Sequence, residues 1–344
     1  MTVQAEDIRK VIAPRPSPGI TAAHLQCVVF PPVEWVVEGY VAEGLTVLAG
    51  KPKLGKSWLA LSIAISVANG GKVLGGRRCA QGAVLYAALE DPARRLKDRL
   101  IKVYGADHRA LWPDNLTFWI HGEMSRLDMG GLDQLRAWIA SNPTAKLIII
   151  DTLAKVRSGA QARESAYEAD YREVSSLKAL AEETGVSIVV VTHTRKAEAD
   201  DPYDTVSGTL GITGAADGTL ILCRDGQGVT LRATGRDVAE IETAVEFDRA
   251  FFGWRELGEA SEVRRSDERA ALLKTLMDTG KPMTSRELAA ETGQTDGAVR
   301  RLLAKMVKAG EVRKPATGRY LHLQLDPGNI GNGGHSGADV GCEE

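Results

Sequence analysis

The residues with the clearest capacity for chemistry form a glycine-framed loop. The pattern is Gly-x-x-x-x-Gly-Lys-Ser, and with the tryptophan that follows it comprises Gly50, Lys51, Pro52, Lys53, Leu54, Gly55, Lys56, Ser57 and Trp58. A β-type apolar run, 44–49, precedes the loop, and an apolar helical segment, 58–67, follows it. This order aims backbone N–H groups and a helix amino terminus at phosphates, which an ordinary glycine turn does not do. With Lys56 on the β- and γ-phosphates and Ser57 on Mg²⁺, the motif predicts binding and hydrolysis of ATP.

A second chemical signal is a carboxylate at the end of a buried strand. Residues 145–151 are nearly all apolar and end in Asp151. Ligands of an open parallel sheet lie at the carboxyl ends of its strands, so this carboxylate is expected beside the glycine-framed loop. Asp151 then binds Mg²⁺ through water or through Ser57, as a Walker B acid does.

Two further strands end in polar side chains. The predicted strand 82–90 ends in Glu90, which can polarise an attacking water. The alternative for Glu90 is to cap the following helix, 91–104. The strand 186–192 is followed by His193, which either contacts the γ-phosphate and reports its loss or has a structural role only.

Several motifs follow one another in a fixed order: GKPKLGKS, LYAALEDP, LIIIDTL, VVVTHTRK, SGTLGITGAADG and TGRD. Together they resemble the RecA-like ATPases of the RepA type, which are hexameric replicative helicases of plasmids and phages. The resemblance covers about residues 33–248. It implies that Glu90 is the catalytic glutamate, Asp151 the Walker B acid and His193 the residue that couples hydrolysis to movement.

The same resemblance implies that each site is completed by an arginine of the neighbouring subunit. Arg236, in the TGRD motif, matches that position, and such an arginine finger can accelerate hydrolysis by about 10³–10⁵. DnaB-like relatives carry a lysine two residues earlier, where this chain has Thr234, and Arg232 is left as a possible substitute. The alternatives for Arg236 are a solvated strand end or an ion pair with Asp237.

The alternation of strands and helices predicts the fold class and domains. Apolar strands separated by helices indicate an α/β domain, a RecA-like P-loop NTPase core whose parallel sheet is covered on both faces. Shorter strands near 219–223, 229–234 and 240–247 are expected to extend this sheet in antiparallel fashion. The predicted domains are an N-terminal segment (1–32), the ATPase core (33–258), a linker (259–266), a winged helix-turn-helix domain (267–323) and a disordered tail (324–344).

Several local signals support the small C-terminal domain and the parts around it. Helices are predicted at 5–12 in the N-terminal segment and at 267–277, then after Ser285 and after Thr295 as N-caps. A two-stranded wing is predicted over residues 310–323, around Thr317-Gly318. Between Thr295 and Tyr320 the chain has seven basic and two acidic residues, which suits contact with duplex DNA, although winged helices also dock proteins.

Composition narrows the class of protein. An apolar content of 44% and a charged content of 26% are ordinary for a globular protein. The net charge of −2 means that DNA contact requires a local patch or a channel shared by subunits. No membrane span or secretory signal is found, and the expected location is the cytoplasm. The widely spaced cysteines argue against a zinc site or disulfide framework; they are Cys27, Cys79, Cys223 and Cys342.

Contact with single-stranded DNA is expected from the loops that follow Asp151 and His193. Their basic and hydroxyl residues suit contact with a phosphate backbone, but residues 197–204 are acidic, and Tyr203 is the one aromatic side chain noted. The loop residues in question are Lys155, Arg157, Arg195, Lys196, Ser207, Gly208 and Thr209.

The sequence favours an ATP-driven motor on DNA, a ring-forming homohexameric helicase that serves replication of a plasmid, phage or integrated element. One alternative is a RecA-like ATPase that regulates replication or recombination without unwinding DNA. Another is a nucleotide-gated DNA-binding regulator that does not hydrolyse ATP. Glu90 argues against the last, because a pure binder needs no carboxylate to activate water.

Overall fold

The computed structural model describes residues 19–105, 111–158, 164–194, 202–206 and 210–325. The chain divides into two compact units, Met1–Leu257 and Gly258–Glu344. The predicted helix 5–12 lies outside the described residues. The predicted tail begins in the last 3-10 turn, Leu323–Leu325, and its remaining residues are outside the description too.

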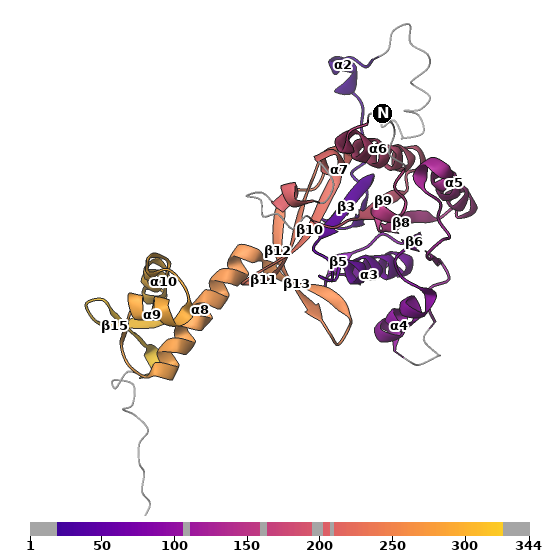
Figure 1. Cartoon of the computed structure of the whole chain (residues 1–344). Helices are drawn as coiled ribbons and strands as arrows, with labels where there is room; N and C mark the ends of the chain where they lie inside the picture. Colours follow the sequence, from indigo (N-terminus) through magenta and orange to yellow (C-terminus); the bar gives the residue numbers. More distant parts are fainter. Residues whose placement is uncertain (1–18, 106–110, 159–163, 195–201, 207–209, 326–344) are drawn as a thin grey trace, which may run out of the picture. The chain divides into compact units, whose positions relative to one another are not determined.

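The first unit is built on a nine-stranded sheet with the order β13-β12-β11-β10-β3-β9-β8-β6-β7 (Figure 1). From β10 to β7 neighbouring strands are parallel, and β11 and β12 are antiparallel additions. Their bounds are β3 Leu45–Gly50, β6 Ala83–Ala88, β7 Leu116–Trp119, β8 Ala145–Asp151, β9 Ser187–Val191, β10 Gly218–Asp225, β11 Gly228–Gly235, β12 Ile241–Asp248 and β13 Gly253–Glu259.

Helices cover both faces of the parallel strands, as continuous apolar strands require (Figure 1). The core on one face contains buried side chains of α3 (Lys56–Asn69) and α4 (Ala93–Tyr104). The core on the other face contains those of α5 (Gly131–Ser141), α6 (Ala166–Thr184) and α7 (Leu210–Ala215). The predicted RecA-like α/β core is therefore confirmed.

Smaller elements complete the first unit. The helix α2 (Ala22–Leu25) buries none of its side chains. Two hairpins are formed by β1 (Trp35–Val37) with β2 (Val41–Ala42) and by β4 (Lys72–Val73) with β5 (Arg77–Arg78). Short 3-10 turns lie at Leu127–Met129, Leu153–Lys155 and Pro202–Thr205.

The sheet corrects two sequence-based expectations. The strand near 219–223, β10, pairs in parallel with β3, so the antiparallel extension begins one strand later, at β11. The loop and helix between β9 and β10 form a crossover, which returns the chain in the parallel direction. The strand β13 was not expected, because only Trp254 among its residues is both large and buried.

The second unit has the order α8 (Ala260–Thr279), β14 (Met283–Thr284), α9 (Ser285–Thr292), α10 (Asp296–Lys308), β15 (Val312–Ala316) and β16 (Arg319–His322). A core of its own includes Leu272, Leu288 and Leu303. Strands β15 and β16 flank Thr317-Gly318 and pair with each other, and β16 also pairs with β14. These are the helices and wing of the winged helix-turn-helix that the sequence predicts.

Two local expectations for this unit are wrong. The predicted linker, 259–266, is not irregular: Glu259 caps α8, and the rest forms its first turns. Its charged residues are good helix formers, and an exposed helical turn needs no large apolar side chain. The N-cap of α9 is Thr284 rather than Ser285, with a capping box to Glu287, whereas Thr295 caps α10 as predicted.

Among the described residues, none of the helices combines the length and the apolar character needed to cross a bilayer.

Candidate nucleotide-binding site

The glycine-framed loop joins β3 to α3, with Gly55 as the N-cap of the helix. Gly55 has φ of +104°, and a Cβ there would lie 2.9 Å from Cζ2 of Trp254. The indole Nε1–H of Trp254 donates to the Gly55 carbonyl oxygen at 3.1 Å. At the other end of the loop, a Cβ on Gly50 would lie 2.6 Å from the carbonyl oxygen of Leu222. Both glycines are therefore fixed by close contacts with neighbouring strands.

Lys56 lies at the centre of the site and is buried. Its ammonium donates to the carbonyl oxygens of Gly50 (2.7 Å) and Lys51 (3.1 Å) and lies 3.1 Å from Nδ1 of His193. Because an ammonium group can only donate, Nδ1 of His193 is the acceptor in this contact. Burial lowers the pKa of Lys56 to about 8, although Asp151 and Glu90 oppose the shift. Burial and the Lys56 charge also lower the pKa of His193.

Asp151 ends β8 with its carboxylate buried. It is hydrogen-bonded by the hydroxyl of Ser57 and by Oη of Tyr86, which donates to Oδ2 at 2.9 Å. Burial raises the pKa of Asp151, while these two hydrogen bonds act in the opposite direction. A serine hydroxyl and one carboxylate are oxygen donors of the kind that Mg²⁺ takes beside a triphosphate, so the residues present fit this cation.

Glu90 follows β6 and lies next to the end of β8. The hydroxyl of Thr152 donates to its Oε1 at 3.3 Å. Its side chain is exposed to solvent, where a water can reach it. The position thus allows Glu90 to act on a water near the phosphate end of the loop.

These side chains line one cavity of about 340 Å³. The sequence-predicted residues in its wall are Lys53, Gly55, Lys56, Ser57, Trp58, Glu90, Asp151 and His193. Gly50, Lys51, Pro52 and Leu54 belong to the same loop but do not line the cavity, and the two carbonyls of Gly50 and Lys51 face Lys56 instead. The structure thus brings together the residues proposed for triphosphate, metal and water.

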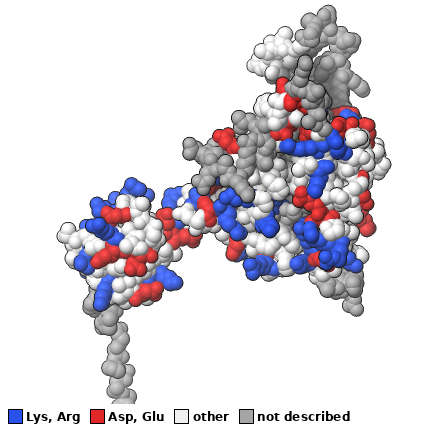
Figure 2. Space-filling model, in the orientation of Figure 1, with Lys and Arg blue, Asp and Glu red and all other residues white. Residues whose placement is uncertain are grey.

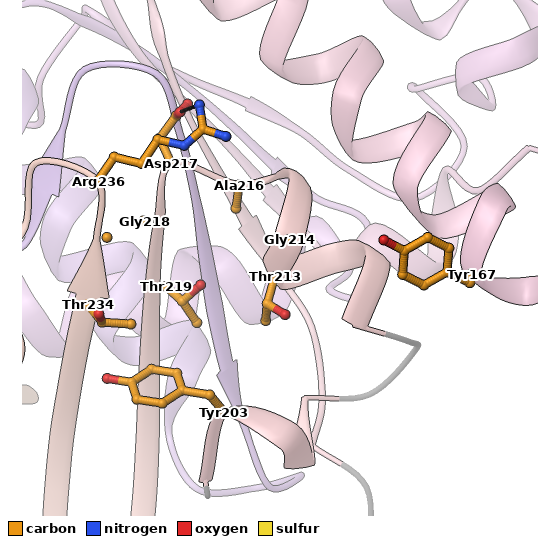
Figure 3. A pocket seen from close by; sticks show the side chains of 11 residues that line it. Tyr167, Tyr203, Thr213, Gly214, Ala216, Asp217, Gly218, Thr219, Thr234 and Arg236 are labelled. Atoms are coloured by element: carbon orange, nitrogen blue, oxygen red, sulfur yellow. Dashed lines mark ion pairs between the residues drawn. The ribbon is translucent and has the colours of Figure 1, made fainter.

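Arg236 lies elsewhere. It follows β11, whose last residue pairs with Gly218 at the amino end of β10, whereas the glycine-framed loop follows the carboxyl end of β3. Figure 3 shows Arg236 with Asp217 in an open trough of about 520 Å³. The ion pair with Asp217 measures 3.5 Å, and the side chain of Arg236 is 64% exposed. Arg236 therefore pairs with Asp217 rather than with Asp237, the partner considered from the sequence, and Arg232 pairs with Glu242 at 3.1 Å.

Comparison with known families decides the classification. A family model described as an AAA domain matches residues 13–199, which is more than half of the chain. The chain belongs to this AAA domain family. A second model, an IclR helix-turn-helix domain, matches residues 270–316, from within α8 to the end of β15.

Solved structures resemble the fold of the AAA domain. One of them, described as the ATPase domain of its protein, matches with a TM-score of 0.50 and 16% identity, over 62% of this chain and 85% of that one. A DnaB-like replicative helicase, solved with regard to its interactions with primase, has a TM-score of 0.49 and 17% identity; the match covers 63% of this chain and 58% of the helicase. A KaiC-like protein from Pyrococcus horikoshii OT3 has a TM-score of 0.43 and 17% identity, over 64% of this chain and 93% of its own.

The AAA domain also contains site residues that the sequence did not single out. Asp91 is buried and forms ion pairs with Arg95 (2.8 Å) and with Arg99, and all three line the nucleotide cavity. The guanidinium of Arg99 lies 5.4 Å from the ring centroid of Trp58. The spacing of Asp91 and Arg95 on a basic helix is a recognisable i, i+4 signal, but it does not reveal that the pair faces the loop.

The loops predicted to contact single-stranded DNA are only partly described. Arg195, Lys196, Ser207, Gly208 and Thr209 lie outside the described residues. Arg157 is compensated within the AAA domain by Asp170 (2.7 Å) and Glu173 (3.8 Å), whereas Lys155 is exposed. The structure adds an aromatic pair that the sequence did not reveal: Tyr167 and Tyr171 are exposed and stacked, with ring centroids 6.2 Å apart.

The basic residues of the C-terminal unit are exposed on α10 and the wing. They are Arg300, Arg301, Lys305, Lys308, Arg313, Lys314 and Arg319. Arg300 pairs with Asp296 at 2.6 Å, and Arg319 donates to the carbonyl oxygen of Pro282 at 2.9 Å. Figure 2 shows basic side chains interspersed with acidic ones on the visible face of this unit.

The lowered pKa of Lys56 predicts a pH-dependent affinity for ATP. The protonated ammonium attracts phosphate, and raising the pH through about 8 removes its proton before ATP binds. We expect the dissociation constant for ATP, measured by titration calorimetry, to rise about tenfold between pH 7 and pH 9. In Lys56→Ala, the affinity should be low and nearly independent of pH in this range. A wild-type affinity that stays constant from pH 7 to pH 9 would contradict the assignment.

Proposed function

We propose that this protein hydrolyses ATP and uses the energy to act on DNA. The observation that carries the proposal is the single cavity shared by Lys56, Glu90 and Asp151. It supplies a cation for the phosphates, a carboxylate for water and oxygen ligands for a metal ion. A protein that only binds nucleotide needs the first and the last but has no use for a carboxylate such as Glu90.

Each residue has a specific part in the proposed reaction. The loop N–H groups and Lys56 bind the triphosphate, and Ser57 and Asp151 would hold Mg²⁺, which neutralises charge on the phosphate oxygens when bound. Glu90 accepts a hydrogen bond from the attacking water and orients it toward the γ-phosphate. His193 contacts Lys56 directly, so loss of the γ-phosphate changes the environment of both side chains.

We further propose that the active assembly is a ring of identical subunits, most simply a hexamer, which acts as a replicative helicase of a plasmid, phage or integrated element in the cytoplasm. The position of Arg236 supports this proposal. Its exposed guanidinium lies in a trough at the amino ends of the strands, whereas the nucleotide cavity of the same chain lies at their carboxyl ends. Arg236 can therefore serve as an arginine finger only for the nucleotide of another subunit.

The second candidate is an ATPase that controls DNA replication or recombination without unwinding the duplex. The winged helix favours it, because its exposed basic residues suit duplex DNA, while Arg157 in the predicted channel loop is already paired within the chain. A strand-displacement assay on a forked substrate separates the two candidates. ATP-dependent displacement supports the helicase, and DNA-stimulated ATP turnover without displacement supports the regulator.

The proposed hydrolysis is tested with Glu90→Gln. Loss of the carboxylate should lower the turnover number for ATP by about 10²–10⁴, while the dissociation constant for ATP stays within a few-fold of the wild type. Asp98→Asn is the matched control, because Asp98 is an exposed carboxylate on α4 that pairs with Arg94 and does not line the cavity. Equal turnover in wild type and Glu90→Gln would leave a nucleotide binder only.

The proposed finger is tested by mixing inactive variants. Arg236→Ala should reduce ATP turnover by about 10³-fold or more while each subunit still binds ATP. Lys56→Ala is inactive for the opposite reason, since it keeps the finger but loses the phosphate site. Mixed assemblies of the two variants should regain measurable turnover, because Lys56→Ala subunits supply arginines to intact cavities. Absence of any gain on mixing, in assemblies shown to contain both variants, would refute action between subunits.

Duplex binding by the winged helix is tested with Arg301→Ala. Arg301 is exposed on α10, the second helix of the helix-turn-helix. Its removal should weaken binding to duplex DNA, and if the contact is with phosphate, the slope of log K against log salt should fall by about one. Lys274→Ala, an exposed cation on α8, serves as the control. Unchanged affinity in variants of all the exposed α10 cations would favour a protein-docking role.

A further inference from the structure

Tyr86 is a buried polar residue that the chemistry above does not use. It lies on β6 and is completely inaccessible to solvent. Its hydroxyl donates to Oδ2 of Asp151 at 2.9 Å, and the same oxygen lies 3.4 Å from the carbonyl oxygen of Ser57. The phenol thus touches both residues assigned to the metal ion, from the side opposite to solvent.

The sheet register explains how Tyr86 reaches this point. Tyr86 pairs with Ile149 of the adjacent parallel strand β8, two positions before Asp151. Side chains two residues apart share one face, so the tyrosine and the carboxylate point toward α3 together. The ring also packs against Phe118, with centroids 5.8 Å apart. A side chain confined in this way holds its hydroxyl at a fixed position.

We infer that Tyr86 is a positioning residue for the divalent cation, because its hydroxyl sets the orientation of the Asp151 carboxylate toward the metal ion. The inference rests on the proposed function, since it concerns the same Mg²⁺-ATP site. Partners behind a metal ligand fix its direction and are needed for full metal affinity. Without the phenol hydroxyl, Oδ2 of a buried carboxylate loses its donor, and the group is free to rotate or to pair elsewhere.

The electrostatics of the contact are consistent with this role. Burial and the neighbouring Asp151 charge raise the pKa of Tyr86 well above its ordinary value, so the phenol stays protonated and remains a donor. The hydrogen bond from Tyr86 in turn favours the charged form of Asp151, which burial disfavours. A charged carboxylate is the form that binds a cation.

The chain offers a matched control in Tyr40. This residue is also fully buried in the same core, and its hydroxyl forms a hydrogen bond of 2.8 Å with Thr243. Tyr40 does not line the nucleotide cavity. The substitutions Tyr86→Phe and Tyr40→Phe each remove one buried, hydrogen-bonded hydroxyl, but only the first touches the metal ligand.

The test measures metal affinity in two ways on the full chain. The first is the Mg²⁺ concentration that gives half-maximal ATP turnover at saturating ATP. The second is the rise in melting temperature produced by ATP with increasing Mn²⁺, compared with ATP in excess EDTA. We expect Tyr86→Phe to raise the half-saturating metal concentration about tenfold in both assays, while the shift produced by ATP in EDTA stays at the wild-type value. Tyr40→Phe should match the wild type in metal dependence.

A double variant separates positioning from general destabilisation. In the Asp151→Asn background the carboxylate is absent, so adding Tyr86→Phe should change the Mn²⁺ dependence of the melting temperature little further. A metal requirement for Tyr86→Phe within twofold of that for Tyr40→Phe would overturn the inference while leaving the proposed function intact. A wild-type protein that shows no metal-dependent stabilisation by ATP would overturn both.

Discussion

The buried ammonium of Lys56 is the constraint on which the rest of this molecule depends. A charged group in a protein interior is stable only when hydrogen bonds and opposite charges replace its lost hydration. Here the direct contacts are two loop carbonyls and one imidazole nitrogen, and the group's lowered pKa reflects its burial. An anion that enters the loop adds the missing charge, so the geometry of β3, the loop and α3 prepares the site for phosphate.

The direction of the strands decides which other residues share this site. His193, Asp151 and Glu90 follow β9, β8 and β6, which lie side by side next to β3 and run parallel to it. Their end residues therefore gather at the edge where the loop lies. Arg236 follows an antiparallel strand and is carried to the other end of the sheet. The same sheet thus separates groups that act on the chain's own nucleotide from one suited to a neighbour's.

Around the loop, neighbouring elements restrict the first turn of α3. Trp254 from β13 hydrogen-bonds the loop at Gly55, and Trp58 packs against Phe247 and Phe252 from β12 and the turn that follows it. On the other side Arg99 covers Trp58 and pairs with Asp91, directly after Glu90. Contacts from both sides therefore fix the helix that presents Ser57, and they link its position to that of Glu90.

Much of the fold and of the candidate site could be predicted because the signals are local. The glycine spacing sets the loop, and the apolar run before Asp151 coincides with β8. The RecA-like core and the winged helix-turn-helix were likewise visible from periodicity, caps and motif order. The errors arose where local patterns are ambiguous: residues 259–266 read as a linker although they continue into α8, and β13 has too few apolar residues to resemble a strand.

By itself, the sequence determined the elements, their order and the residue types available for chemistry, because backbone preferences and hydrophobic periodicity act over a few neighbouring residues. Only the tertiary structure decided which of those residues meet. The contact of Tyr86 with Asp151, the Trp254 hydrogen bond to Gly55 and the ion pair of Arg236 with Asp217 each join segments separated in the chain. Such contacts depend on strand order and register, which are set by the packing of the whole sheet rather than by any local pattern.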